Sequence, residues 1–396
     1  MHRRSFLLST GTFLLSSLIT GCQQNNQGVF SIKLLKGSVP SQIVNQFTKG
    51  LEPGQQSKFI PTEQLEDIFK QLQTWQVKPK AGDKQGFSIQ FPWSDTPLAS
   101  SFPNRSLGDT SDLVTLGDYW LKNAIEQKLI QPLDQEQLKT WSALPKKWQA
   151  LVTRNEQGYL DTKGKIWGAP YRWGGTVIVY RRDKLEQLGL TIKDWGDLWD
   201  SQLRERISLL NHPREIVGLV LKKLGQSYNT ENLDKIPLLE QELLSLKPQI
   251  KVFNSNRYIE PLLMGDTYAA VGWSSDIIQT ISRYPQLAAV MPASGTSLWA
   301  DLWVIPKNDN QKNEDKKNLL YQWINFCWSP NVAQQISLLT KTNSPISINV
   351  QPSDIPEQLH DLLFTKSEII DKSEFLLPLS TDAQKQYESK FNILKS

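Results

Sequence analysis

Histidine and cysteine are scarce in this 396-residue chain, which has three of the first and two of the second. His2 stands in a leader that we expect to be removed, so only His212 and His360 remain for the body of the protein. Histidine-based nucleophilic sites and zinc sites usually need more such residues in one place. The sequence therefore argues against hydrolytic and metal chemistry, and we expect neither a metal nor a cofactor.

Motifs that cradle phosphates or position a catalytic serine are also missing. The chain has no Gly-x-Ser-x-Gly elbow, no Gly-Lys-Ser loop and no Gly-x-Gly-x-x-Gly sequence after a strand. A strong surplus of one charge is missing too, because the formal charge of +4 falls to +2 once Arg3 and Arg4 leave with the leader. Basic and acidic residues are interspersed, so we expect no nucleic-acid partner.

The first 22 residues predict export. Arg3 and Arg4 precede an apolar stretch at 6–19, which is short and interrupted by Ser, Thr and Gly, as in a signal peptide rather than a membrane span. The sequence LITGC at 18–22 resembles the lipobox of bacterial lipoproteins, in which the cysteine, here Cys22, is acylated. The start RRSFL also resembles the twin-arginine export signal, although ordinary secretory leaders also begin with arginine pairs.

Acylation of Cys22 would leave Cys327 without a disulfide partner. We interpret Cys327, between Phe326 and Trp328, as a small buried apolar residue. Residues 23–29, rich in Gln and Asn, are typical of a flexible tether between a membrane surface and a folded body.

Strand-like and helix-like stretches alternate along the body. We expect strands at 30–35, 111–115, 176–180 and 268–273, and helices at 40–49, 62–76, 119–130, 183–188 and 276–283. Repeated strand-then-helix units predict an α/β protein with parallel-rich sheets flanked by helices. In such folds ligands bind beyond the carboxyl ends of the strands. We therefore expect the functional residues just after the strands.

Five segments together resemble the spermidine/putrescine-binding proteins of ABC importers. They are SDLVTLGDY at 111–119, WGAPYRWG at 167–174, PRE at 213–215, AVGWS at 270–274 and LWADLWVIP at 298–306. In order and spacing these segments cover most of residues 110–345, whereas residues 30–105 match poorly. The resemblance implies a two-lobed periplasmic-binding-protein fold of type II, in which each lobe is a mixed sheet flanked by helices and crossover strands form the hinge.

The resemblance also implies a division of the chain. After a signal peptide at 1–22 and a tether at 23–29, the N-lobe would comprise residues 30–172 and 300–346, and the C-lobe residues 173–299 and 347–396. The chain would cross between the lobes near 171–174, 299–301 and 344–348.

The same resemblance assigns candidate ligand-binding residues. An ammonium group leaving water needs a carboxylate or an aromatic face in exchange. Trp299 and Asp301 match the family's Trp-x-Asp pair, and alternation along a strand places both on one face. We expect Asp301 to pair with an amine and Trp299 to line the methylene spacer. Trp273 matches a second aromatic wall, and Tyr119 would offer a ring and a hydroxyl.

The second lobe departs from the family pattern. Glu215 matches a carboxylate that engages an amine, but His212 stands where the family has Asp. Losing that anion weakens the case for the longest and most charged polyamines. Asp118, where the family has a small polar residue, either restores an anion or caps a helix. These differences favour a diamine, or a ligand that is not a polyamine.

We interpret the chain as a monomeric, lipid-anchored solute-binding protein, not an enzyme, that gives a putrescine- or spermidine-like polyamine to an ABC permease. Its place would be the periplasm or the outer face of the cytoplasmic membrane. Three alternatives remain open at this point. The same fold could hold an oligosaccharide or another organic cation, the 14 tryptophans and two carboxylates could form a lipoprotein glycosidase, or the protein could act as a sensor or scaffold.

Overall fold

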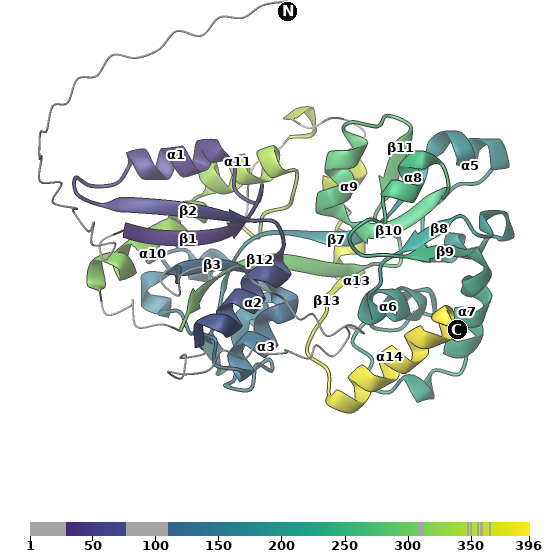
Figure 1. Ribbon diagram of the computed structural model, residues 1–396, viewed down its shortest axis with the longest axis horizontal. Helices are drawn as coiled ribbons and strands as arrows, with labels where there is room; N and C mark the ends of the chain where they lie inside the picture. The colour runs from purple at the N-terminus through teal and green to yellow at the C-terminus, as the bar shows by residue number, and fades with distance from the viewer. Residues whose placement is uncertain are drawn as a thin grey trace, which may run out of the picture.

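The computed structural model describes residues 29–76, 110–307 and 313–346 and most of residues 348–396. Within them one sheet of eleven strands spans the molecule, with helices on both faces (Figure 1). Its main path runs through β2 (Gln56–Thr62), β1 (Val29–Leu35), β3 (Leu113–Gly117), β12 (Ser297–Pro306), β7 (Ala169–Arg181), β10 (Ala269–Trp273), β8 (Ile207–Leu209) and β9 (Ile250–Phe253). Parallel pairs dominate its two ends, whereas β7 and β12 pair antiparallel at its centre. The expected α/β class is confirmed.

Shorter elements complete the two ends. Strands β4 (Ile130–Gln131) and β13 (Glu374–Phe375) pair with β12, β11 (Leu287–Val290) pairs with β7, and β5 (Thr153–Arg154) and β6 (Lys165–Ile166) pair with each other. The helices of the first end are α1 (Ser41–Lys49), α2 (Leu65–Gln76), α3 (Leu121–Glu126), α4 (Lys146–Val152), α10 (Glu314–Cys327) and α11 (Pro330–Thr340). Those of the second end are α5 (Arg182–Leu188), α6 (Pro213–Lys223), α7 (Leu239–Leu246), α8 (Glu260–Met264), α9 (Ser274–Ile281), α12 (His360–Leu363), α13 (Ser367–Lys372) and α14 (Thr381–Lys395).

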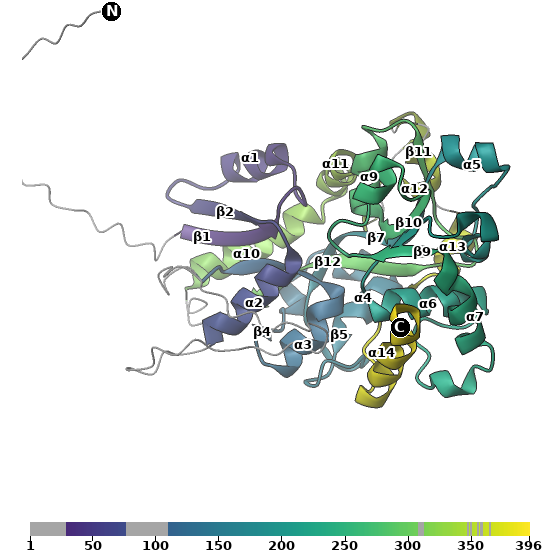
Figure 2. The same ribbon diagram turned by 45° about the vertical axis from the view of Figure 1, so that its right-hand side comes forward.

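Two separate hydrophobic cores lie along this sheet. The first contains the buried Trp303 and Trp323, and in it α10 packs against β1 while α11 packs against α1 and β7. The second contains Trp195, and the apolar face of α14 packs into it beside α6 and α7 (Figure 2). Strand β7 supplies Tyr171 to the first core and Val177 to the second. The two-lobed fold is therefore confirmed, while the lobe limits given above stay a prediction.

The predicted crossings lie side by side. Residues 169–175 of β7, which include the first crossing, pair with residues 298–303 of β12, which include the second. Trp173 and Asn343 exchange two backbone hydrogen bonds of 2.9 Å, and the indole Nε1 of Trp173 donates to the carbonyl of Ser344 at 3.0 Å. The start of the third crossing thus joins the other two, while residues 347, 349 and 350 lie outside the described part of the chain.

Most of the expected elements are confirmed, with two corrections. Strand β2 was not predicted, because Pro61 and weak alternation are not typical of a strand. It nevertheless pairs with β1 along its whole length. The single helix expected at 119–130 is wrong, because α3 ends at Glu126 and the chain enters β4 at Ile130. Lys128 makes this turn possible with φ at 55°, a left-handed conformation that no helix continues.

The export leader, Cys22 and the tether lie outside the described residues. Among the residues that the structure describes, no helix is both long and apolar enough to cross a bilayer.

Candidate functional site

The pairing register of β7 and β12 builds one face at the centre of the sheet. Asp301 lies opposite Arg172, and Trp299 lies opposite Gly174. Directly opposite residues of an antiparallel pair share a face, as do residues two apart along a strand. Ser297, two residues before Trp299, therefore belongs to the same row. We call these five residues the crossover face.

Asp301 and Arg172 form a buried ion pair on the crossover face. The Arg172 Nε donates to Asp301 Oδ2 at 2.6 Å, and the two side chains are 7% and 3% exposed. The guanidinium carbon lies 5.8 Å from the centre of the Trp299 ring. Burial raises the pKa of Asp301, and the charge of Arg172 opposes this effect. The cation that contacts both Asp301 and Trp299 thus comes from the chain itself.

Gly174 gives Trp299 its place. A Cβ at Gly174 would lie 2.4 Å from Cζ2 of Trp299 and 2.3 Å from Oγ of Ser274. The indole of Trp299 therefore lies directly over the glycine backbone. Its Nε1 is buried and has no hydrogen-bond partner in the described structure. A side chain at this position would force either the ring or the strand to move.

Glu215 reaches the crossover face from the second lobe. It stands in the first turn of α6 and is 5% exposed. Its Oε2 accepts a hydrogen bond from Ser297 Oγ at 2.5 Å. Burial raises the pKa of Glu215, and the Ser297 hydroxyl opposes this effect. Ser297 and Asp301 are four residues apart on β12, which is about 13 Å along a strand. Glu215 therefore contacts β12 about 13 Å from Asp301.

His212 and Tyr119 bring the two lobes together beyond the strand ends. Tyr119 follows β3 and His212 precedes α6, and their ring centres are 5.1 Å apart at an angle of 68°. The His212 Nδ1 accepts from the backbone N–H of Glu215 at 3.4 Å and caps α6. Burial lowers the pKa of His212 to about 4, so the ring is neutral at pH 7.

The carboxylate of Asp118 accepts a hydrogen bond from the backbone. Its Oδ1 accepts from the backbone N–H of Ala300 at 2.9 Å, and the residue is 5% exposed. Burial raises its pKa to about 7, against the lowering effect of the Ala300 hydrogen bond. Asp118 is therefore protonated to a much larger extent near neutral pH than an ordinary aspartate. The contact ties β12 to the turn that follows β3.

Trp273 ends β10 and lies opposite Thr176 of β7. Its backbone N–H donates to the Tyr258 hydroxyl at 3.2 Å, and that hydroxyl donates to Asp276 Oδ2 at 3.1 Å. Tyr258 also packs against the bare backbone of Gly272, where a Cβ would lie 1.9 Å from its ring. Trp273 is thus held as a partly exposed indole next to the crossing strands.

The comparison with known proteins follows this geometry. Residues 108–372, more than half of the chain, match the model of a family described as bacterial extracellular solute-binding protein. The chain belongs to this family. Its members bind solutes, which agrees with a site built between two lobes.

Individual relatives of this solute-binding protein are distant in sequence. The spermidine/putrescine-binding periplasmic protein of Salmonella typhimurium is 26% identical over 287 residues, covering 72% of this chain and 77% of its own. The putrescine-binding periplasmic protein PotF of Escherichia coli is 28% identical over 242 residues, covering 57% and 62%. The crystal structure of the spermidine/putrescine ABC transporter substrate-binding protein PotD from Streptococcus pneumoniae gives a TM-score of 0.70 at 19% identity, covering 93% of this chain and 98% of that one. At that identity the structural likeness shows the fold.

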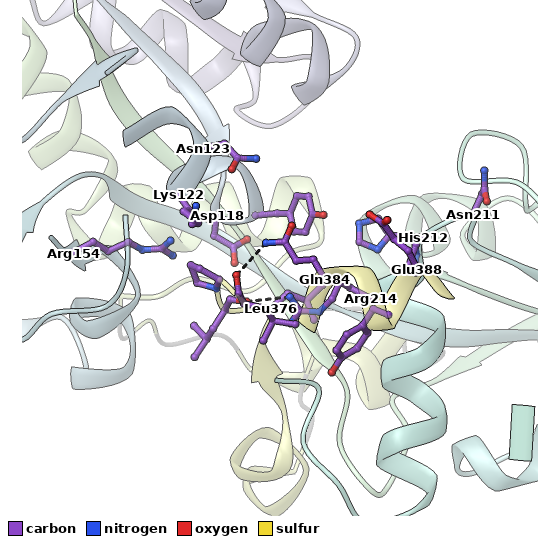
Figure 3. Close-up of a pocket in the computed structure, with 16 residues that line it drawn as sticks. Asp118, Lys122, Asn123, Arg154, Asn211, His212, Arg214, Leu376, Gln384 and Glu388 are labelled. Atoms are coloured by element: carbon purple, nitrogen blue, oxygen red, sulfur yellow. Dashed lines mark hydrogen bonds between the residues drawn. The ribbon is translucent and has the colours of Figure 1, made fainter. Parts of the chain in front are cut away.

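An open pocket of the solute-binding protein lies beside the crossover face, between the lobes (Figure 3). Three of the seven candidate residues line it, namely Asp118, Tyr119 and His212. The other four, Trp273, Glu215, Trp299 and Asp301, are outside its lining. The structure therefore groups the candidates into two adjoining parts, and their roles in binding stay a prediction.

Several residues of this region were missed from the sequence. Arg172 and Arg214 stand inside the segments that carried the resemblance, but nothing in their spacing showed which partners they contact. Arg214 donates to the carbonyl of Leu377 at 3.1 Å, which brings the C-terminal segment into the pocket wall (Figure 3). Arg154, also buried, donates to the carbonyl of Leu151 at 2.8 Å. Within the described ranges no cluster of three or more His, Cys, Asp or Glu could hold a metal ion.

Proposed function

We propose that this solute-binding protein holds an organic amine of the polyamine class between its lobes and delivers it to an ABC permease. The crossover face carries the proposal, because it holds a buried carboxylate and an indole ring and is contacted by a second buried carboxylate from the other lobe. Asp301 and Trp299 lie at its centre, and Glu215 joins it through Ser297. The names of the relatives, which bind spermidine and putrescine, support the same class of solute.

The chemistry of the site suits an alkylammonium guest. A charge-assisted hydrogen bond contributes roughly 1.5–3 kcal/mol, and a cation over an indole about 0.5–2 kcal/mol. Glu215 would supply the first kind of contact, and Trp273 and Trp299 would supply aromatic walls for the second. Because the guest is buried, each contact replaces water lost from the ammonium group.

Lobe closure would follow from the placement of these groups. Trp299 and Asp301 stand on the crossing strand β12, whereas Glu215 and His212 stand at the start of α6 in the second lobe. A solute that first contacts the crossing strands would gain its remaining contacts only when the second lobe approaches. Crossing strands of this kind act as hinges in two-domain binding proteins.

Export and anchoring are part of the proposal. The leader at 1–22 and Cys22 support a lipid-anchored protein in the periplasm or on the outer face of the cytoplasmic membrane, with residues 23–29 as tether. Cells grown with a radiolabelled fatty acid should label the wild-type protein and not a Cys22→Ser variant. Equal labelling of the two would contradict the anchor. Size-exclusion chromatography with light scattering would test the expected monomer.

A thermal-unfolding screen tests the proposed solute. Putrescine, cadaverine, spermidine, single amino acids and oligosaccharides are added in turn to the purified protein. A ligand at 100 times its dissociation constant adds about 2.7 kcal/mol to the free energy of unfolding. We expect at least one amine to raise the melting temperature and no oligosaccharide to do so.

A matched pair of variants connects the result to the site. Trp299→Ala should weaken the amine effect, whereas Trp141→Ala should not, because Trp141 packs against the first core outside the site described above. The opposite pattern, in which an oligosaccharide raises the melting temperature and every amine leaves it unmoved, rules out the polyamine class.

A further inference from the structure

We propose that Glu388, on the C-terminal helix α14, holds the outer ammonium group of the polyamine in the open pocket between the lobes. This inference rests on the proposed function and deepens it, because it names a second anionic anchor and therefore a solute with at least two ammonium groups. The position of Glu388 in the pocket wall carries it.

Helix α14 presents one face to the pocket. Gln384, Tyr387 and Glu388 all line the pocket, and their spacing of three and four residues places them on one side of a helix. The Tyr387 hydroxyl donates to the carbonyl of Tyr228 at 2.8 Å, and the Tyr387 ring centre lies 5.0 Å from the guanidinium carbon of Arg214. Both contacts lie within the second lobe. Glu388 therefore belongs to a fixed wall of that lobe.

Tyr119 supplies a wall of the pocket on the side of the first lobe. Burial raises the pKa of Tyr119, and the charge of Arg214 opposes this effect. The charges of Glu215 and Glu388 add to the rise, so both carboxylates are close enough to act on one phenol ring. Figure 3 shows Glu388 and His212 on the same side of the pocket. A solute along Tyr119 would thus meet Glu215 at the crossover face and Glu388 in the pocket.

The carboxylate of Glu388 is available to a solute. Across the described residues it takes part in no hydrogen bond and no ion pair, and the residue is half-buried. Burial raises its pKa, and the charge of the exposed Lys385 opposes this effect. A carboxylate that loses water without gaining a partner is unfavourable. An ammonium group of the solute would supply that partner.

Two of the positive side chains in the pocket wall, Lys122 and Arg154, have acidic neighbours in the first lobe. Lys122 Nζ forms an ion pair of 2.6 Å with Glu126. Burial lowers the pKa of Arg154 to about 10, and the charge of Asp118 opposes this effect. Neither cation is therefore the partner of the Glu388 carboxylate.

The third positive side chain of the wall, Arg214, stands between two other acids. Burial lowers its pKa, and the charges of Glu215 and Glu231 are among the effects that oppose this shift. Its two terminal nitrogens already donate to main-chain carbonyls and to a side-chain amide. One arginine balances only one of its two acidic neighbours. Ammonium groups at Glu215 and at Glu388 would therefore complete the charge balance of the region.

Isothermal titration calorimetry with putrescine, spermidine and butylamine tests this inference. Glu388→Gln keeps the size of the side chain and removes its charge. It should weaken binding of the tighter polyamine about three- to tenfold, because a half-buried contact lies between an exposed ion pair and a buried charge-assisted hydrogen bond. Butylamine has no second ammonium group, so its affinity should change less than about twofold.

Asp382→Asn is the matched control. Asp382 stands in the first turn of α14, is exposed and lies outside the pocket lining. The control removes the same unit of charge from the same helix, and it should leave the affinity for every amine within about twofold of the wild-type value. Urea unfolding curves of the ligand-free variants show whether both are folded.

The results separate this inference from the proposed function. Weakening of a polyamine by at least about threefold in Glu388→Gln relative to Asp382→Asn, with butylamine unaffected, supports the inference. A smaller difference between the two variants, or an equal loss for butylamine and the polyamines, overturns it and leaves the proposed function standing. Failure of every amine to bind the wild-type protein overturns both.

Discussion

Gly174→Ala should impair solute binding through a single methyl group. In the present structure that carbon would lie 2.4 Å from Cζ2 and 2.8 Å from Cε2 of Trp299, and 2.3 Å from Oγ of Ser274. Real side chains do not tolerate such distances, so either the indole or the strand has to move. The indole is the freer of the two, because Trp299 is partly exposed and β7 is paired on both sides. We therefore expect Trp299 to leave the crossover face.

The size of the effect follows from the packing strain and from the aromatic wall that the solute would no longer meet. Overpacking of this kind costs about 1–3 kcal/mol of folding stability. Displacing Trp299 also removes an aromatic wall worth about 0.5–2 kcal/mol for a cation, which weakens amine binding about 2- to 30-fold. Calorimetric titration with the best amine of the screen measures the second effect, and a urea unfolding curve without ligand measures the first.

Gly175→Ala is the matched control. It places the same methyl group on the neighbouring residue and the opposite face of β7, where the nearest atoms are Met291 Cε at 3.0 Å and Thr296 Cγ2 at 3.1 Å. The flexible end of Met291 can move, so binding should stay near the wild-type value. If Gly174→Ala binds the amine as tightly as Gly175→Ala, the close contact of Trp299 with Gly174 does not support the site.

Three further predictions concern buried ionisable groups. The pKa of Asp118 is raised to about 7, so its contribution to the free energy of unfolding is full at low pH and falls by about 1.4 kcal/mol per pH unit between pH 3.8 and 7. Asp118→Asn should abolish this contribution to the pH dependence, which urea unfolding curves at pH 5 and 7 measure. An unchanged pH dependence in the variant would refute the raised pKa. The pKa of His212 is lowered to about 4, so its contribution to the free energy of unfolding is full above pH 6.5 and falls as the pH drops toward 4. His212→Asn should therefore make the protein more resistant to unfolding by acid. Equal or greater acid sensitivity of the variant would contradict this prediction. Cys327 is 1% exposed and burial raises its pKa, so in a Cys22→Ser variant the thiol should react with Ellman's reagent only after unfolding, and rapid reaction in buffer would disprove the burial.

The sequence was informative wherever local patterns carry the signal. Alternation and β-branched residues located the strands that became β1, β3, β7 and β10, and the strand-then-helix order indicated the α/β class. Alternation also put Trp299 and Asp301 on one face, and both side chains do contact Arg172. These features depend on residues close together in the chain, so they can be read without knowing the fold.

Weak local patterns led to the errors. Strand β2, with Pro61 and no fully buried side chain, has no clear alternation and is defined by its pairing with β1. The helix after β3 ends early because Lys128 adopts a left-handed conformation, which a lysine in the sequence does not indicate.

What Asp301 contacts was decided by tertiary structure alone. The sequence determined that an acid and an indole would share a face of β12, but the register between β7 and β12 set Arg172 rather than another residue opposite Asp301. The C-terminal segment around Leu377 likewise joined the pocket wall through the carbonyl that accepts from Arg214, 163 residues away. Backbone pairing and burial between distant segments fix such contacts, and short-range periodicity carries no information about them.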